Sequence, residues 1–155
     1  MLRRLVAGLT FCAAVYGSLG PGALASRPGS FYVRSVTLAT SRHDVAPKGP
    51  SVGDTSTERD RLINPVAQFG GPAGAVVGRD RLRIVLTGPS SAAVTGMVVL
   101  PGGTLEVKGT IRRTGPRGVY PIVSGTGRFL HAHGTVAIIG AGARPLNRFK
   151  LSYSP

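Results

Sequence analysis

Residues 120–139 read YPIVSGTGRFLHAHGTVAII, with two apolar segments on either side of a glycine-rich turn at 124–127. Glycine at two of these four positions suits a tight, irregular turn. After the turn, residues 128–139 have the length of one long strand, whose side chains would alternate between two faces. One face would carry Leu130, Ala132, Gly134, Val136 and Ile138, and the other Phe129, His131, His133, Thr135 and Ala137. This pattern predicts a half-buried antiparallel strand.

The same two-residue alternation recurs along the chain. It predicts strands at residues 30–40, 75–87, 92–100, 104–112 and 146–153, and a short strand or turn within 52–63. No segment of the mature chain has a sustained 3.6-residue apolar period. Regularly spaced turns between short strands are typical of an all-β sandwich or barrel. Asp80, which stands among arginines, is expected to be a surface charge partner.

Three sequence blocks carry a family resemblance. Residues 123–136 fit the pattern V-x-G-T-G-x-F-x-x-A-x-G-T-V, residues 100–111 (LPGGTLEVKGTI) fit an L-P-G-G block, and Gly53-Asp54 fits a Gly-Asp pair. The chain in this respect resembles the dirigent proteins and the related allene oxide cyclases over residues 53–155. That resemblance implies an antiparallel β-barrel of roughly eight strands. It also implies a hydrophobic central cavity and, in many members, a trimer.

The first 25 residues have the pattern of a secretory signal peptide. Arg3 and Arg4 precede an apolar run at 5–19, and Ala23-Leu24-Ala25 is a small-x-small cleavage site. We expect cleavage after Ala25 and secretion of the remainder, with an N-terminal strand and loop at 26–52 leading into the barrel at 53–155. The apolar run is too short, and too interrupted by glycine, for a transmembrane anchor. The single cysteine, Cys12, would leave with this segment, which excludes disulfides and thiolate chemistry from the mature chain.

The chain is strongly basic, with a formal charge of +13 from 19 Lys and Arg against six carboxylates. Such a charge favours anionic surroundings such as nucleic acid, acidic polysaccharide or anionic lipid. No nucleic-acid motif is present, and only four Tyr and five Phe could stack on bases, so a nucleic-acid partner is not expected. The simplest interpretation is a secreted barrel with a cationic shell. Adhesion to an acidic cell-wall polymer or to lipid is the other possibility that the charge leaves open.

Three side chains are candidate catalytic groups. Asp54 matches the Gly-Asp pair and would be an acid or base in the pocket, or else would fix a turn by accepting backbone N–H bonds. Glu106 would point into the cavity, or into solvent beside Lys108. His133 would be an acid or base that titrates near neutral pH.

Other candidates concern ligands and metals. Tyr120, Arg128 and Phe129 are candidate ligand contacts. An H-x-H pair such as His131 and His133 can supply two metal ligands, but no third ligand stands at a useful spacing, so no metal site is predicted. Exposed or inter-subunit imidazoles are the plainer interpretation. The family pattern usually has arginine at position 133 and, in several plant members, an acidic residue at position 128.

The resemblance implies a barrel that binds a small hydrophobic molecule and guides its cyclisation or stereoselective coupling. Positioning alone can lower the barrier of such reactions, so the activity would be isomerase-like and would need no cofactor. The differences at Arg128 and His133 favour an alternative, a non-catalytic barrel that acts as a carrier or a cell-envelope binding protein.

Overall fold

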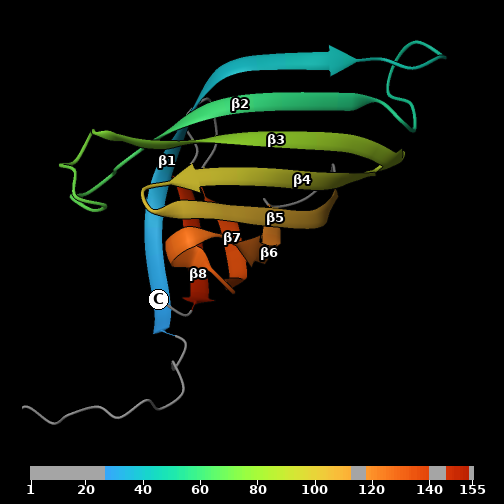
Figure 1. Cartoon of the computed structure of the whole chain (residues 1–155). Coiled ribbons are helices and arrows are strands. Elements are labelled where there is room, and N and C mark those ends of the chain that lie inside the picture. Colours follow the sequence, from blue (N-terminus) through green and yellow to red (C-terminus); the bar gives the residue numbers. More distant parts are fainter. Residues whose placement is uncertain (1–26, 113–117, 140–145, 154–155) are drawn as a thin grey trace, which may run out of the picture.

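The computed structural model describes residues 27–112, 118–139 and 146–153. The eight strands are β1 (Arg27–His43), β2 (Thr55–Ile63), β3 (Val76–Gly88), β4 (Ser91–Leu100), β5 (Gly103–Arg112), β6 (Val119–Gly125), β7 (His133–Ile139) and β8 (Leu146–Tyr153), with a 3-10 turn, η1 (Gly127–Phe129), before β7. Each strand pairs antiparallel with its neighbour in the chain, and β1 pairs with β8 to close the barrel (Figure 1). The described residues contain no helix that is both long and apolar enough to cross a membrane.

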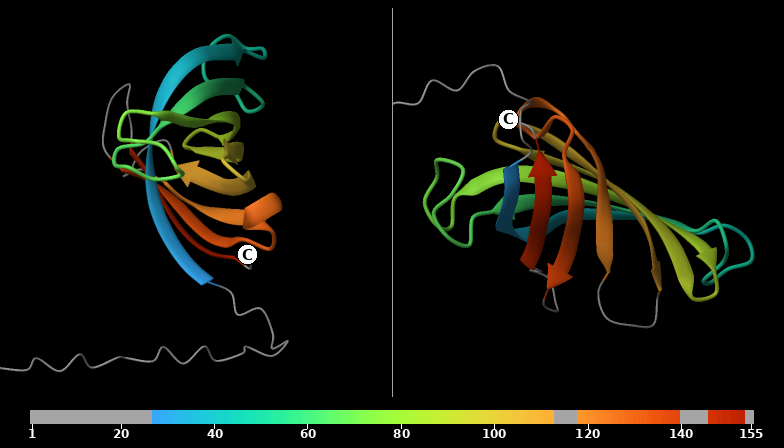
Figure 2. Two further views of the ribbon diagram at one scale, coloured as in Figure 1. Left: turned by 60° about the vertical axis from the view of Figure 1, so that its left-hand side comes forward. Right: turned by 90° about the horizontal axis from the view of Figure 1, so that it is seen from below.

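β1 closes the barrel because it pairs with two strands in succession. Residues 27–34 pair with β8, and residues 34–43 pair with β2. The register shifts between Thr37 and Ala39, which marks an irregularity of the kind that bends a strand. Figure 2 shows β1 as one long, curved strand. The barrel therefore includes a strand that precedes residue 53.

The predicted all-β antiparallel barrel is confirmed. The predicted strands at 75–87, 92–100, 104–112 and 146–153 match β3, β4, β5 and β8 to within a residue or two at their ends. The strand predicted at 30–40 is longer, and the polar stretch at 52–63 holds a full strand, β2.

The strand predicted at residues 128–139 is wrong over its first five residues. These form η1 and the bend that follows it, and His131 has a φ of 59°, in the left-handed region that a strand does not use. The expected alternation is therefore broken before β7. Phe129 is 2% exposed and Leu130 is 50% exposed, the reverse of the prediction, whereas Val136 faces inward as expected.

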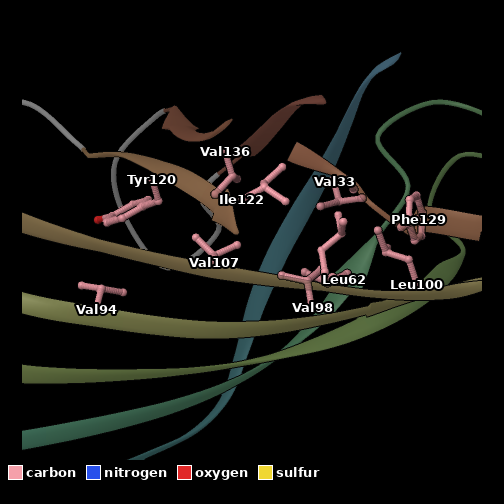
Figure 3. Packing of buried hydrophobic residues seen from close by; sticks show 12 residues of the cluster. Val33, Leu62, Val94, Val98, Leu100, Val107, Tyr120, Ile122, Phe129 and Val136 are labelled. Carbon is pink, nitrogen blue, oxygen red and sulfur yellow. The ribbon is translucent and has the colours of Figure 1, made fainter. Parts of the chain in front are cut away.

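The apolar core extends from the end of the barrel that holds η1 and the β4–β5 hairpin to Val94 and Tyr120 at its other end. Figure 3 shows Phe129, Leu100, Leu62 and Val33 close together at the end that holds η1, which we call the closed end. Val33, Leu62 and Phe129 are at most 2% exposed. The opposite end, at the β1–β2 and β3–β4 connections, we call the mouth.

Two of the glycine-rich motifs pack against each other at the closed end. The backbone N–H of Arg128 donates to the carbonyl of Gly102 over 2.8 Å. A Cβ atom on Gly103 would lie 2.0 Å from the carbonyl oxygen of Thr126, so only glycine permits this approach. The contact holds η1 in place and seats the Phe129 ring in the core. These motifs therefore shape the closed end of the barrel.

Candidate functional site

A row of polar side chains lies on the inner face of β2. Ser56, Glu58 and Asp60 stand at alternate positions in phase with Leu62, which is fully buried. Alternate residues of a strand line the same face of a sheet. The row therefore runs along the inside of the barrel, from the mouth to the core.

Asp60 lies directly opposite a second buried aspartate, Asp80 of β3. The two residues are 5% and 6% exposed. Directly opposed residues in an antiparallel pair have Cβ atoms about 4.5–5.5 Å apart. The hydroxyl groups of Thr37 and Ser35 hydrogen-bond to Asp60 and Asp80 respectively. The Oδ1 atom of each aspartate has no hydrogen-bond partner among the described residues. Two buried carboxyl groups so placed disfavour the ionisation of both at once.

The pKa values of this cluster are raised. Burial, together with the charges of Asp60 and Glu58, raises the pKa of Asp80 to about 7, and the hydrogen bond with Ser35 opposes this shift. Burial also raises the pKa of Asp60. For Glu58, burial and then the charge of Asp60 raise the pKa, and Arg42 opposes them. The cluster can therefore both accept and donate a proton near neutral pH.

A cavity of about 420 Å³ opens at the mouth of the barrel. Ser56, Ile84 and Leu86 line it from the strands, and residues of the β1–β2 connection, including Pro50, line it from the other side. Ser56 is two residues from Glu58 on the same face of β2. Arg42, His43, Asp44 and Asp54 also line the cavity. Within the carboxyl cluster, Glu58 is the member next to the cavity along β2, and the Asp60–Asp80 pair lies behind it.

Tyr120 belongs to the inner wall of the barrel. It is 8% exposed, and burial raises the pKa of its hydroxyl group. Figure 3 shows its ring at the other end of the core cluster from Phe129, with the hydroxyl pointing away from the cluster. A ligand contact by Tyr120 stays a prediction.

Asp54 lines the mouth cavity, but both of its carboxylate oxygens have backbone partners. Oδ1 accepts from the N–H of Val45 over 2.9 Å, and Oδ2 accepts from the N–H of Ser51 over 2.8 Å. These bonds lower the pKa of Asp54. The Asp54 carboxylate thus fixes the β1–β2 connection, as the alternative prediction for this residue stated. Asp54 does not belong to the cluster of Glu58, Asp60 and Asp80, and its role as an acid or base stays a prediction.

Glu106 points away from the interior, because its neighbours Leu105 and Val107 are buried inside. Its Oε1 lies 3.0 Å from the Nζ atom of Lys108, and its Oε2 accepts from the hydroxyl of Ser124 over 3.0 Å. Both interactions lower the pKa of Glu106, and the interaction with Lys108 has the larger effect.

His131 and His133 are both exposed, and the Nδ1 atom of His133 lies 3.3 Å from the carbonyl oxygen of His131. No group of three metal-binding side chains occurs among the described residues. The structure does not bring Asp54, Glu106 and His133 together.

Arg128 and Phe129 lie at the closed end, away from the mouth. The guanidinium carbon of Arg128 is 5.5 Å from the ring centre of Phe129 and 6.0 Å from that of Phe69. With Phe31, these residues line a cleft of about 240 Å³. Any ligand contact by Arg128 and Phe129 would occur there, apart from the carboxyl cluster.

The sequence prediction for Asp80 was wrong, since this residue is buried rather than a surface charge partner. The signal was present in the alternation, because Asp80 is in phase with Leu82 and Ile84, which face inward. Asp60 is likewise in phase with Leu62. The flanking arginines occupy the other face.

No protein-family model matches this sequence, and no curated protein sequence matches it. Solved structures do share its architecture. A pyocyanin demethylase superposes with a TM-score of 0.68 at 20% identity, covering 79% of this chain and 99% of that one. A pterocarpan synthase dirigent protein gives a TM-score of 0.63 at 15% identity, covering 92% and 100%. The Diels-Alderase AbmU from Streptomyces koyangensis gives 0.64 at 16% identity, covering 82% and 67%. The fold is a dirigent-type barrel.

Proposed function

We propose that this barrel binds a small apolar molecule at its mouth and guides the cyclisation or coupling of that molecule. Glu58 and the Asp60–Asp80 pair would be its proton-transfer groups. The observation that carries the proposal is the pair of opposed, buried aspartates, each with an unpartnered oxygen. Carboxyl groups are almost never fully buried unless they are paired, and strongly shifted pKa values gather at functional sites. The likeness to a dirigent pterocarpan synthase and a Diels-Alderase adds support for a barrel that serves as a reaction vessel.

The proposed chemistry is a proton relay within one bound molecule. Glu58, nearest the cavity, would take a proton from an acidic C–H or O–H group of the substrate. A protonated carboxyl group of the cluster would return a proton to the atom on which negative charge develops. The product is then an isomer of the substrate. Glu58 passes the proton it has gained to the carboxylate that donated one, and the cluster returns to its starting protonation state. The apolar side chains of Ile84 and Leu86 would hold the substrate in a folded conformation.

Two further features belong to the proposal. The signal peptide predicted at residues 1–25 lies outside the described residues, and secretion follows from it. The homotrimer implied by the resemblance would place several such barrels in one assembly. A carrier role is the competing function, and it would need the same mouth cavity without the proton relay.

A blocked mouth provides the test. Ser56 lines the cavity, whereas the adjacent Thr57 belongs to the alternate, outward-facing positions of β2. We expect the native protein to bind Nile red, a neutral apolar dye, with an affinity that salt does not change. Ser56→Trp would weaken that binding by about tenfold or more, and Thr57→Trp would leave it unchanged. Absence of dye binding, or equal effects of the two tryptophans, would contradict a ligand site at the mouth.

A further inference from the structure

Five arginines lie in adjacent positions on the outer face of β2 and β3. Arg59 stands directly opposite Arg81, and Arg61 directly opposite Arg79, while Arg83 follows on β3. All five side chains are exposed. Like charges directly opposite each other destabilise a sheet. The arrangement is therefore unfavourable for the isolated protein, and an anionic partner would relieve it.

The protein's own carboxylates do not supply that partner. Of the six, Glu58, Asp60 and Asp80 face the interior, Asp54 is held by backbone N–H groups, and Glu106 pairs with Lys108. The remaining one, Asp44, lies in the β1–β2 connection at the mouth. Among the described residues, none of the five arginines forms an ion pair.

An apolar groove adjoins these arginines. It has a volume of about 550 Å³, and its lining residues come from β1 to β5. They include Glu106, which is paired with Lys108, and the buried Asp60 and Asp80. Leu38, Met97 and Val99 line it beside Arg79, Arg81 and Arg83. Leu38 is 61% exposed and Met97 is 57% exposed. The surface thus offers guanidinium groups and hydrocarbon side by side.

We propose that this surface docks onto an anionic phospholipid membrane. We call it the arginine face, and it consists of Arg59, Arg61, Arg79, Arg81, Arg83, Leu38 and Met97. Guanidinium groups bind phosphate through paired hydrogen bonds. Exposed Leu38 and Met97 would enter the boundary between the head groups and the acyl chains. A lipid surface presents both of these chemistries together.

Two other partners fit this surface less well. Single-stranded nucleic acid is bound with aromatic side chains that stack on bases, and the lining of the groove contains none. A second copy of this chain docked face to face would bring two sets of arginines together. The lipid surface is the partner that matches both the charge and the exposed apolar side chains.

Vesicle co-sedimentation tests the proposal. We expect the native protein to bind vesicles of phosphatidylcholine that also contain phosphatidylglycerol, to ignore pure phosphatidylcholine, and to be released as salt rises. The double variant Arg59→Gln/Arg81→Gln would bind about tenfold more weakly or worse. The matched variant Lys48→Gln/Arg112→Gln loses the same charge from exposed positions outside the arginine face, and it would bind almost as the native protein does.

The apolar side chains of the arginine face are tested separately. The double variant Leu38→Ser/Met97→Ser would weaken vesicle binding with no change in charge. Each variant is first compared with the native protein by urea unfolding, and the arginine variant should be at least as stable because one like-charge pair is removed. Equal losses in both charge variants would attribute binding to net charge alone and overturn the proposal. Tighter binding of the native protein to an oligonucleotide than to the vesicles would also overturn the proposal. Dye binding at the mouth is a separate readout, because Ser56 faces the interior.

Discussion

The buried Asp80 carboxyl group destabilises the folded barrel when it is ionised. It lies in the interior opposite Asp60, with one hydroxyl partner, Ser35, and one unpartnered oxygen. An unsatisfied buried polar group typically costs about 1–3 kcal/mol of stability. A residue that served the fold alone would be apolar here, as Leu82 and Ile84 are in the same row. The cost is consistent with a role in proton transfer.

Asp80→Asn tests this cost through pH. The folded-state pKa of about 7 exceeds the ordinary value of 3.8, so the folded protein binds this proton more tightly than the unfolded chain does. The stabilisation that comes from this tighter proton binding is thus complete below about pH 4, and it is lost as the pH rises through about 7. We expect Asp80→Asn to raise the free energy of unfolding at pH 8 by roughly 1–3 kcal/mol. The fall in stability between acid and neutral pH would become shallower.

Urea unfolding at several pH values measures the effect, and Asp44→Asn is the control because Asp44 is exposed. Some pH dependence should persist in Asp80→Asn, since burial raises the pKa of Glu58 and Asp60 too. If Asp80→Asn and Asp44→Asn changed the pH profile equally, Asp80 would not hold the shifted proton.

At the scale of elements, the glycine motifs make the backbone contacts that close one end of the barrel. Gly127 has a φ of 60°, and a Cβ atom there would lie 2.1 Å from the carbonyl oxygen of Gly102. The hydroxyls of Thr104 and Thr126 also lie 2.6 Å apart across the same contact. The β4–β5 hairpin and η1 are thus joined by their backbones and by side chains.

Gly127→Ala should be far more costly than an alanine at another positive-φ glycine. Gly49 has a φ of 99°, but a Cβ atom added there would meet nothing within 4 Å. We expect Gly49→Ala to cost about 1–2 kcal/mol from backbone strain alone. Gly127→Ala, which adds a backbone clash, should cost roughly 3–5 kcal/mol in urea unfolding. Similar values for the two variants would show that the closed end does not depend on this contact.

The strands were predictable because alternation fixes both the period and the face, as for Leu82 and Ile84 in β3 and Leu105 in β5. The start of β7 could not be predicted, because His131 adopts a left-handed backbone conformation that a histidine in the sequence does not indicate. The inward orientation of Asp60 and Asp80 could be inferred from their phase. Their direct opposition could not, since cross-strand register depends on turns that the sequence does not specify.

At the scale of the whole molecule, the two ends of the barrel differ in structure, because one is packed and the other opens into a cavity. The closed end holds the two glycine-rich motifs and the Phe129 ring, whereas the mouth holds Asp54 and the cavity beside Ser56. β1 connects them, since it pairs with β8 near the closed end and with β2 toward the mouth. The sequence blocks that resemble the dirigent pattern predicted the fold, whereas Glu58, Asp60 and Asp80 lie outside those blocks.

The most direct test of the proposed function is the identity of the molecule that the barrel carries. Native mass spectrometry of the protein isolated from its own host would be combined with chromatography of the released ligand, for the native chain and for Glu58→Gln/Asp80→Asn. The proposal predicts a stoichiometric apolar ligand of one mass in both proteins, released as the product isomer from the native chain and as its unreacted isomer from the variant. The same isomer from both would indicate a carrier, and an empty native barrel would contradict the ligand site itself.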